Sequence, residues 1–362
     1  MALPFDIRPH AQPIPAAERA ERMADPGFGR VFTDHMAVIR WSEGEGWHDA
    51  HVAARAPLVM DPASSVLHYA QEIFEGMKAY RLADGGTALF RPTANARRFR
   101  DSARRMAMPE VPEELFVEAV ERLVAADRDW VPAPGVDGSL YLRPFQIASG
   151  VFLGVRPSDE YLFMVIAATV GAYWKGGARA ISCWVSPDYT RAAPGGTGAA
   201  KCGGNYAGSL LAQKEAIAKG CDQVVFLDAV ERRWVEELGG MNVFFVFDDG
   251  SIATPPLTGT ILPGITRDSI LTIARDRGMT VREEPYAIDE WRADAASGRL
   301  VEAFACGTAA VVTTIGEVVE PEGRFKVGNG QAGPVTTALG EALLGIQRGV
   351  ASDPHGWLHR LS

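Results

Sequence analysis

The stretch GGTGAAKCGGNYAG, residues 195–208, places a single lysine, Lys201, among small residues. It is not a P-loop, because Ala200 and Cys202 stand where that motif needs Gly and Ser or Thr. It is not GxGxxG either, since Lys201 takes the place of the last glycine. Small neighbours let a flat ligand approach the backbone, where a confined lysine can act as a nucleophile or Schiff-base former. From this stretch alone, a flexible surface loop with a solvated lysine is an equal alternative.

The composition is that of an ordinary globular protein. The 362 residues are 47% hydrophobic and 22% charged, a length that suggests one large or two medium domains. The net charge of −9 disfavours a general nucleic-acid binder. The four cysteines form no CxxC pair, which favours a reducing compartment.

Membrane and export signals are also missing from the sequence. Residues 1–30 contain no apolar signal-peptide core. The longest apolar run, residues 161–174, is shorter than the roughly 20 residues needed to span a bilayer. We therefore expect a soluble, cytoplasmic protein.

Helix and strand patterns alternate in both halves and predict two α/β-type domains with a cleft between them. We expect a smaller α+β domain at residues 1–174, a linker at 175–178, and a larger α/β domain at 179–362 that carries Lys201. Asn95 is expected to cap the first long helix. The predicted helices are 95–106, 110–129, 206–219 and 266–277; the predicted strands lie at 28–41, 77–81, 87–90, 141–147, 161–168, 180–185, 223–227 and within 234–247, 251–253 and 302–319.

A second unusual segment places two acids, Glu236 and Glu237, before Leu-Gly-Gly-Met-Asn and a strand that looks buried. An acid at a strand start is usually solvated, but one that must protonate or polarise a heteroaromatic nitrogen needs such a buried edge position. Tyr206, five residues after Lys201, could hydrogen-bond a ring oxygen of a bound ligand. A packed tyrosine at a helix start is the commoner alternative.

Three features could bind a phosphate. Arg98 lies in the first turns of its predicted helix, although its many arginine neighbours favour a solvated basic face. Residues 263–266 lead into a helix N-terminus, which favours anions. Residues 306–308 form a small turn with a hydroxyl group. No metal site is predicted, because His48 and His51 have no third ligand spaced to join them.

Taken together, ordered segments from about residue 28 to 315 resemble the branched-chain amino acid aminotransferases. These enzymes belong to the fold-type IV pyridoxal phosphate class, in the class-IV aminotransferase family. The segments are FTDHM (32–36), LHYAQEIFEGMKAYR (67–81), FRP…NARR (90–98), YLRPF (141–145), AKCGGNYAG (200–208), EELGGMNVFFVF (236–247), LTGTILPGITRDS (257–269) and CGTAA (306–310).

The resemblance implies a two-domain α/β (α+β) fold with pyridoxal 5'-phosphate between the domains. Lys201 is similar to the family's Schiff-base lysine, Glu237 to the acid at the pyridine nitrogen, and Tyr206 to the tyrosine at the phenolic oxygen. Positions matching the phosphate site are Arg98, Ile265, Thr266 and Thr308. Positions matching the substrate pocket are Phe28, Tyr69, Phe74, Tyr141 and Tyr173 for the side chain, Arg143 for the distal carboxylate of glutamate, and Gly240 and Ala309 for the α-carboxylate.

The implied reaction is transamination of L-leucine, L-isoleucine and L-valine with 2-oxoglutarate by a ping-pong route. The family also implies a homodimer in which residues 153–155 reach the neighbour's pocket. A D-amino acid transaminase or an aminodeoxychorismate lyase of the same fold would share Lys201 and Glu237, and activity on L-leucine distinguishes them. A non-enzymatic binder of a phosphate ligand is a further alternative, for which Lys201 would be dispensable.

Overall fold

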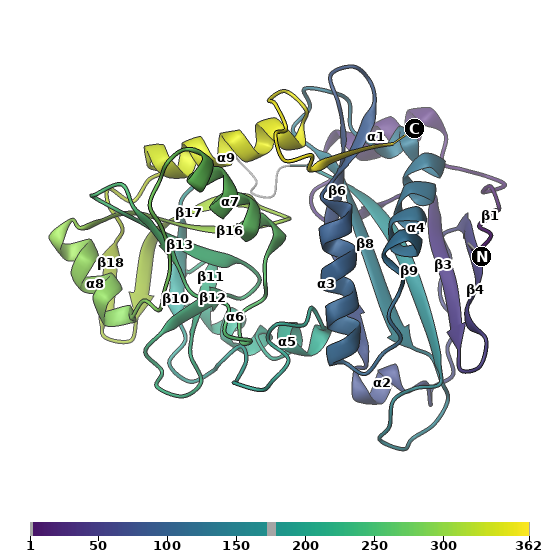
Figure 1. The fold of residues 1–362 in the computed structure, drawn as a ribbon, viewed down its shortest axis with the longest axis horizontal. Coiled ribbons are helices and arrows are strands. Elements are labelled where there is room, and N and C mark those ends of the chain that lie inside the picture. The colour runs from purple at the N-terminus through teal and green to yellow at the C-terminus, as the bar shows by residue number, and fades with distance from the viewer. Residues whose placement is uncertain (1–2, 172–178, 362) are drawn as a thin grey trace. The chain divides into compact units, whose positions relative to one another are not determined.

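The computed structural model describes residues 3–171 and 179–361 and divides into two compact units (Figure 1). The first unit takes in the described parts of 1–173, 200–203 and 346–362, and the second takes in the remainder. Two segments that the predicted domains place in the second domain, 200–203 and 346–362, thus belong to the first unit. Residues 200–203 join the first unit because Ala200 and Cys202 pack in its core. Residues 346–362 join it because their strand pairs there. The predicted linker, 175–178, lies outside the described residues.

The first unit is built on a ten-stranded sheet, as far as the described residues go, ordered β1-β4-β3-β9-β8-β6-β7-β19, with β2 on β9 and β5 on β8. Only the pairing of β1 with β4 is parallel among those described. The strands are β1 (Asp6–Ile7), β2 (Val31–Phe32), β3 (His35–Ser42), β4 (Gly46–Ala54), β5 (Glu72–Phe74), β6 (Met77–Arg81), β7 (Thr87–Phe90), β8 (Ser139–Ala148), β9 (Glu160–Val170) and β19 (Leu358–Leu361).

The first unit has four α-helices and one 3₁₀ helix among its described residues, and the two long α-helices pack on one face of this sheet. The helices are α1 (Ala16–Ala24), α2 (Val66–Tyr69), α3 (Pro92–Arg105), α4 (Glu113–Ala126) and the short 3₁₀ helix η1 (Arg128–Trp130). In Figure 1, α3 and α4 lie side by side along the sheet. The core between helices and sheet includes Phe99 of α3, Phe116 of α4 and Phe163 of β9, whose rings contact one another.

Strand β8 shows how the sheet positions a site. Successive side chains of a strand point to opposite faces. Leu140 and Leu142 enter the core under the helices, so Tyr141 and Arg143 project from the other face of the sheet. The sequence pattern LYLR thus separates core residues from residues available for a ligand.

The second unit is built on a nine-stranded sheet, counted over the described residues, ordered β12-β11-β10-β17-β16-β13-β14-β15 with β18 on β17. Its centre is parallel, because β10 pairs in that sense with both β11 and β17. The strands are β10 (Ile181–Val185), β11 (Gln223–Leu227), β12 (Val235–Leu238), β13 (Asn242–Phe247), β14 (Ile252–Thr254), β15 (Val281–Glu283), β16 (Leu300–Gly307), β17 (Val311–Glu320) and β18 (Gly323–Lys326).

The helices numbered from α5 onward pack around this second sheet. Helix α6 packs on β11, α7 on β15 and β16, and α8 on β16 and β18. The helices are α5 (Gly203–Ala207), α6 (Leu210–Ala218), α7 (Ile265–Asp276), α8 (Ile288–Ser297) and α9 (Pro334–Gln347). No helix among the described residues has the length and apolar character that a membrane crossing requires.

Several predicted elements need correction. The helix expected to start at Asn95 starts at Pro92, because the left-handed Arg91 (φ 52°) turns the chain and proline suits the first helical turn. The Asn95 side chain is therefore buried inside the helix span and is not a cap. The helix expected at 206–219 is divided into α5 and α6. The long strands expected at 28–41 and 234–247 are each divided in two, the latter at Gly239 and Gly240.

Candidate active site

The backbone of Lys201 is fixed within the first unit. The N–H of Phe74 donates to the carbonyl of Lys201 at 2.9 Å, and the N–H of Lys201 donates to the hydroxyl of Ser102 at 2.9 Å. Its neighbours Ala200 and Cys202 are each only 2% exposed. The segment is thus held between β5 and α3, and the alternative of a flexible surface loop is wrong.

The Lys201 side chain extends over an aromatic ring that a second cation also contacts. Its Nζ lies 4.8 Å from the ring centre of Phe74. The guanidinium carbon of Arg143 lies 4.7 Å from the same centre. Contacts of this kind attract a cation to the ring face. They place the amine and the guanidinium against one aromatic wall.

A buried carboxylate that the sequence analysis missed lies next to this lysine. Glu75 is fully buried and accepts hydrogen bonds from Arg98 at 2.7 and 2.9 Å and from Asn95 at 2.7 Å. Burial alone would raise the pKa of Glu75, but the charge and hydrogen bonds of Arg98, with the charge of Lys201, bring that pKa below its ordinary value. The solvated basic face favoured for Arg98 is therefore wrong, because a buried carboxylate partner holds its guanidinium.

The predicted pocket residues of the first unit lie partly together. The hydroxyl of Tyr141 accepts a hydrogen bond from Arg143 at 3.2 Å, and the ring of Phe28 lies 5.2 Å from that of Tyr141. Phe74 joins them through Arg143. An added Cβ at Gly76 would collide with the Tyr141 hydroxyl, so only glycine leaves room for this ring.

Two predicted pocket residues are outside this group. The hydroxyl of Tyr69 donates to the carbonyl of Leu153. Tyr173 lies outside the described residues. A further acid, Glu72, accepts a hydrogen bond from the N–H of Gly203. Burial raises the pKa of Glu72, and the Gly203 hydrogen bond and the charge of Arg143 oppose this only in part.

In the second unit, Glu237 is a buried carboxylate with defined partners. It is 2% exposed, lies 2.8 Å from Arg191, and accepts a hydrogen bond from the N–H of Leu262 at 2.9 Å. Arg191 also donates to the carbonyl of Thr260 at 2.9 Å. A buried charge of this kind needs such pairing to be tolerated. The arrangement pairs the buried carboxylate of Glu237, on strand β12, with a buried guanidinium, whereas an acid at a strand start is ordinarily solvated.

Its neighbour Glu236 has a different environment, because adjacent residues of a strand face opposite sides. The hydroxyl of Thr260 donates to Glu236 at 2.5 Å. Burial raises the pKa of Glu236 above its ordinary value, and the Thr260 hydrogen bond opposes this rise only in part. Of the two acids, Glu237 is thus the one held by a buried cation.

Other predicted residues of the second unit gather at turns and a helix start. Thr266 is buried in the first turn of α7, directly after Ile265, and Gly264 caps that helix. A Cβ at Gly240 would be 3.8 Å from the ring of Tyr206. A Cβ at Gly307 would be 3.6 Å from the carbonyl of Gly240. The turn at 308–310 that contains Thr308 and Ala309 follows Gly307, so the two glycine turns are adjacent.

These donors fit pyridoxal phosphate by their chemistry. Lys201 offers an amine for the aldehyde, Glu237 a buried carboxylate for a protonated ring nitrogen, and the start of α7 backbone N–H groups for a phosphate. The described residues contain no group of three His, Cys, Asp or Glu side chains arranged to hold a metal ion.

Comparisons with known proteins agree with this chemistry. The family model described as "Amino-transferase class IV" matches residues 72–318. The chain belongs to the class IV aminotransferases. A probable branched-chain-amino-acid aminotransferase of Streptomyces coelicolor is 57% identical over 358 residues, covering 99% of each chain.

Solved branched-chain amino acid aminotransferases share the fold. The branched-chain amino acid aminotransferase of Escherichia coli has a TM-score of 0.74 at 31% identity, covering 90% of this chain and all of its own. The branched-chain amino acid aminotransferase of Thermobaculum terrenum, solved in its PLP-form, has a TM-score of 0.70 at 26% identity, covering 90% of this chain and 98% of its own. The predicted resemblance and the α/β fold class are thereby confirmed, and the chain is an aminotransferase.

Sequence reasoning missed Glu75, Ser102 and Arg191 in this aminotransferase. Asn95 and Arg98 are three residues apart and share a helix face, which was a usable signal that both turn inward. Nothing in the spacing names Glu75 as their partner. Arg191 stands in a loop before the glycine-rich stretch and has no pattern to distinguish it from a solvated residue.

Proposed function

We propose that the protein transfers amino groups from L-leucine, L-isoleucine and L-valine to 2-oxoglutarate, with pyridoxal 5'-phosphate as cofactor and ping-pong kinetics. The observation that carries the proposal is the fixed position of Lys201 between β5 and α3, beside an aromatic wall and a second cation. The name of the relative that is 57% identical over nearly the whole chain supports the substrate class.

The proposed chemistry needs a base near the substrate's α-carbon and a carboxylate at the ring nitrogen of the cofactor. Bound pyridoxal phosphate supplies an electron sink for the electrons left when the substrate's α-carbon loses its proton. The amine of Lys201 is the base that would remove this proton from the α-carbon and deliver it to C4′ of the cofactor. Glu237 would hold a proton at the ring nitrogen, and the guanidinium of Arg191 would hold the Glu237 carboxylate in place.

The remaining proposed cofactor contacts orient the ring. Ile265 and Thr266 offer backbone N–H groups at the start of α7, and Thr308 adds a hydroxyl, for the phosphate. Arg98 is the proposed cationic phosphate partner, and Tyr206 the partner of the phenolic oxygen. An anchored phosphate fixes the ring angle, which keeps the reacting carbon near the lysine amine.

Substrate selection is proposed to combine an apolar wall with one cation. Phe28, Phe74 and Tyr141 contact one another directly or through Arg143, and suit an aliphatic side chain. Tyr69 and Tyr173 are proposed to complete this wall. Backbone amides of the turns at Gly240 and Ala309 are proposed to bind the α-carboxylate.

The same pocket must accept the second substrate. Arg143 has a buried Nε with no hydrogen-bond partner among the described residues, so a donor remains for the distal carboxylate of glutamate. We also propose that the protein works in the cytoplasm as a homodimer. Leu153 and Val155, which are 67% and 88% exposed, would then reach the neighbour's pocket.

The test replaces the lysine. Lys201→Ala should lower transamination of L-leucine by orders of magnitude, because the variant lacks the amine proposed to move the α-proton. Lys214→Ala, on the exposed side of α6, is the matched control and should keep turnover within about twofold. Turnover should be measured under saturating L-leucine and 2-oxoglutarate. Near-normal activity of the Lys201 variant would contradict the proposal.

A further inference from the structure

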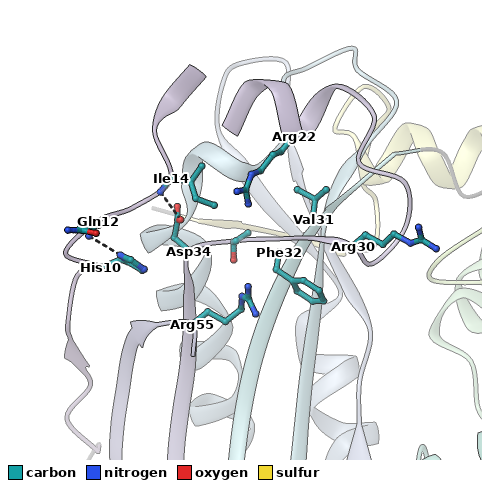
Figure 2. A pocket seen from close by; sticks show the side chains of 10 residues that line it. His10, Gln12, Ile14, Arg22, Arg30, Val31, Phe32, Asp34 and Arg55 are labelled. Atoms are coloured by element: carbon teal, nitrogen blue, oxygen red, sulfur yellow. Dashed lines mark hydrogen bonds between the residues drawn. The ribbon is translucent and has the colours of Figure 1, made fainter. Parts of the chain in front are cut away.

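A pocket of about 330 Å³ lies in the first unit, and none of the residues proposed above for cofactor or substrate is among those that line it. Figure 2 shows its walls, which come from the N-terminal segment with α1, from β2 and the residues around it, and from the end of β4. Ile14, Val31 and Phe32 give it an apolar part. Arginines give it a cationic part.

Two of its arginines face the pocket. In Figure 2 the guanidinium groups of Arg22 and Arg55 point toward the space between them, whereas that of Arg30 points away. Arg55 stacks on Phe32, 5.0 Å from the ring centre, and forms no ion pair among the described residues. One nitrogen of Arg22, Nη2, forms a half-exposed ion pair with Glu18. The other N–H groups of this guanidinium can still donate to a ligand.

The acidic residue in the wall, Asp34, forms no ion pair with these arginines among the described residues, and its two oxygens accept from neutral N–H groups. One oxygen of Asp34 accepts the N–H of Ile14 at 3.0 Å, and the other accepts the indole N–H of Trp130 at 2.8 Å. The lining thus holds three arginines against one aspartate, and its formal charge is positive.

A buried hydroxyl in the same wall is left unpaired by the part of the chain that the structure describes. Thr33 lines the pocket, is 2% exposed, and its Oγ1 has no hydrogen-bond partner among the described residues. A buried polar group left unsatisfied is costly, and such groups usually have a ligand or a water. A hydroxyl in a wall that also holds arginines is suited to donate to an anion.

The pocket wall is fixed before any ligand binds. The N–H of His10 donates to Nε2 of His35 at 2.9 Å, and Nδ1 of His35 bonds to Asp127 at 2.6 Å. Together with the bond from Ile14 to Asp34, these contacts hold the N-terminal segment against the first unit. A preformed site avoids the entropic cost of ordering its wall on binding.

We propose that this pocket binds a small phosphate monoester. The phosphate would lie between Arg22 and Arg55 with a hydrogen bond from Thr33, and its organic part against Ile14, Val31 and Phe32. Two guanidinium groups match the charge of a phosphate dianion and offer several donors to its oxygens. The pocket exceeds the size of inorganic phosphate, so an organic part is expected to add affinity. This proposal does not depend on the proposed reaction.

Calorimetric titration of the full-length protein tests it, after saturation with pyridoxal phosphate and removal of the excess. Inorganic phosphate and phenyl phosphate are the probes, and phenyl phosphate should bind more tightly. Arg22→Gln combined with Arg55→Gln should weaken phenyl phosphate about tenfold or more. Arg30→Gln, in the same wall but pointing away, should change it less than about twofold. Absence of saturable binding at about 10 mM probe, or equal losses in both variants, would overturn the proposal.

A second variant separates a ligand role from a structural one. Thr33→Val removes the unpaired hydroxyl with little change in shape, so the ligand-free protein should melt at the same or a higher temperature. The same variant should bind phenyl phosphate several-fold more weakly. A lower melting temperature together with unchanged binding would show that the hydroxyl serves the fold, and would contradict its role in the pocket.

Discussion

At the scale of single residues, Arg143 carries the proposed dual specificity. Its guanidinium lies over the rings of both Phe74 and Tyr141, and its buried Nε has no hydrogen-bond partner among the described residues. Aromatic stacking holds the cation but does not use up its in-plane donors. A substrate carboxylate can therefore be received with little rearrangement.

Arg143→Ala should raise the Michaelis constant for L-glutamate by about tenfold or more, and that for L-leucine much less. The physical reason is that only glutamate loses a charge-assisted hydrogen bond. Steady-state kinetics with each amino acid in turn would measure this. Arg122→Ala, whose partner Glu118 is on the surface of α4, is the control and should alter neither constant. Equal increases for both amino acids would argue against the role of Arg143.

Local composition indicated Lys201 and the pair Glu236 and Glu237, because a lysine among glycines and two acids before a strand that looks buried are unusual. The choice of Glu237 from this pair came from the family resemblance. The pairing of Glu75 with Arg98 could not be predicted. Glu75 lies between β5 and β6, and Arg98 lies in α3. Only the packing of α3 on the sheet brings the two side chains together. Local patterns show which residues are unusual, but not their partners.

At the scale of elements, a close backbone contact supports the buried ion pair of the second unit. A Cβ on Gly198 would be 2.6 Å from the carbonyl carbon of Thr260. The oxygen of that carbonyl accepts a hydrogen bond from Arg191, the partner of Glu237. The close contact between the loops of Gly198 and Thr260 thus helps to position Arg191, and through it the carboxylate of Glu237.

Gly198→Ala should lower the free energy of unfolding by roughly 2–4 kcal/mol, because backbone must move to relieve the overlap. Urea denaturation would measure the change. Gly340→Ala in α9 is the matched control, since its Cβ would meet only ordinary contacts with Val312. Alanine in a helix should leave stability equal or raise it by up to about 1 kcal/mol. Equal stability of Gly198→Ala and the wild type would contradict this account.

Element boundaries were predicted well where turn residues are unambiguous. The strands Met77–Arg81, Thr87–Phe90 and Gln223–Leu227 match the expected ranges, and Asp84-Gly-Gly marks the first turn. The start of α3 was misplaced because Asn95 resembles a cap, whereas Arg91 in a left-handed turn begins the helix. Arginine is an unusual residue in that conformation, so the sequence carried no sign of the turn itself, although Pro92 is typical of a first helical turn.

At the scale of the whole molecule, the last strand is the clearest lesson. Strand β19 pairs with β7, far away in sequence, and Trp357 packs its ring on Phe90. Such a non-local pairing leaves no periodic signal in either strand. The place of this last strand in the first unit therefore needed the structure, although the α/β class did not.

The pH dependence of stability offers a prediction at this scale through Lys78. Burial lowers the pKa of Lys78 from 10.5 to about 8, with Asp137 opposing and Arg348 adding to the shift. Between these two values the unfolded chain binds more protons than the folded protein, so the free energy of unfolding rises with pH. Below about pH 8 both states are charged and the cost of burying the charge is constant.

The difference in unfolding free energy between the wild type and Lys78→Met should therefore shift in favour of the wild type by about 2 kcal/mol between pH 8 and pH 10. Denaturation at a series of pH values would measure it. Lys214→Met, at an exposed position, should show no such shift relative to the wild type. Parallel pH curves for the wild type and Lys78→Met would contradict the lowered pKa.

The most direct measurement of the central claim is a visible absorption spectrum of the protein loaded with pyridoxal phosphate. L-leucine is added first, without any oxo acid, and 2-oxoglutarate is added afterwards. We predict that L-leucine abolishes the visible band of the bound cofactor and that 2-oxoglutarate restores it, because the two half-reactions are separable in a ping-pong mechanism. A spectrum that L-leucine leaves unchanged would contradict the account and favour a D-amino acid transaminase or a lyase of the same fold.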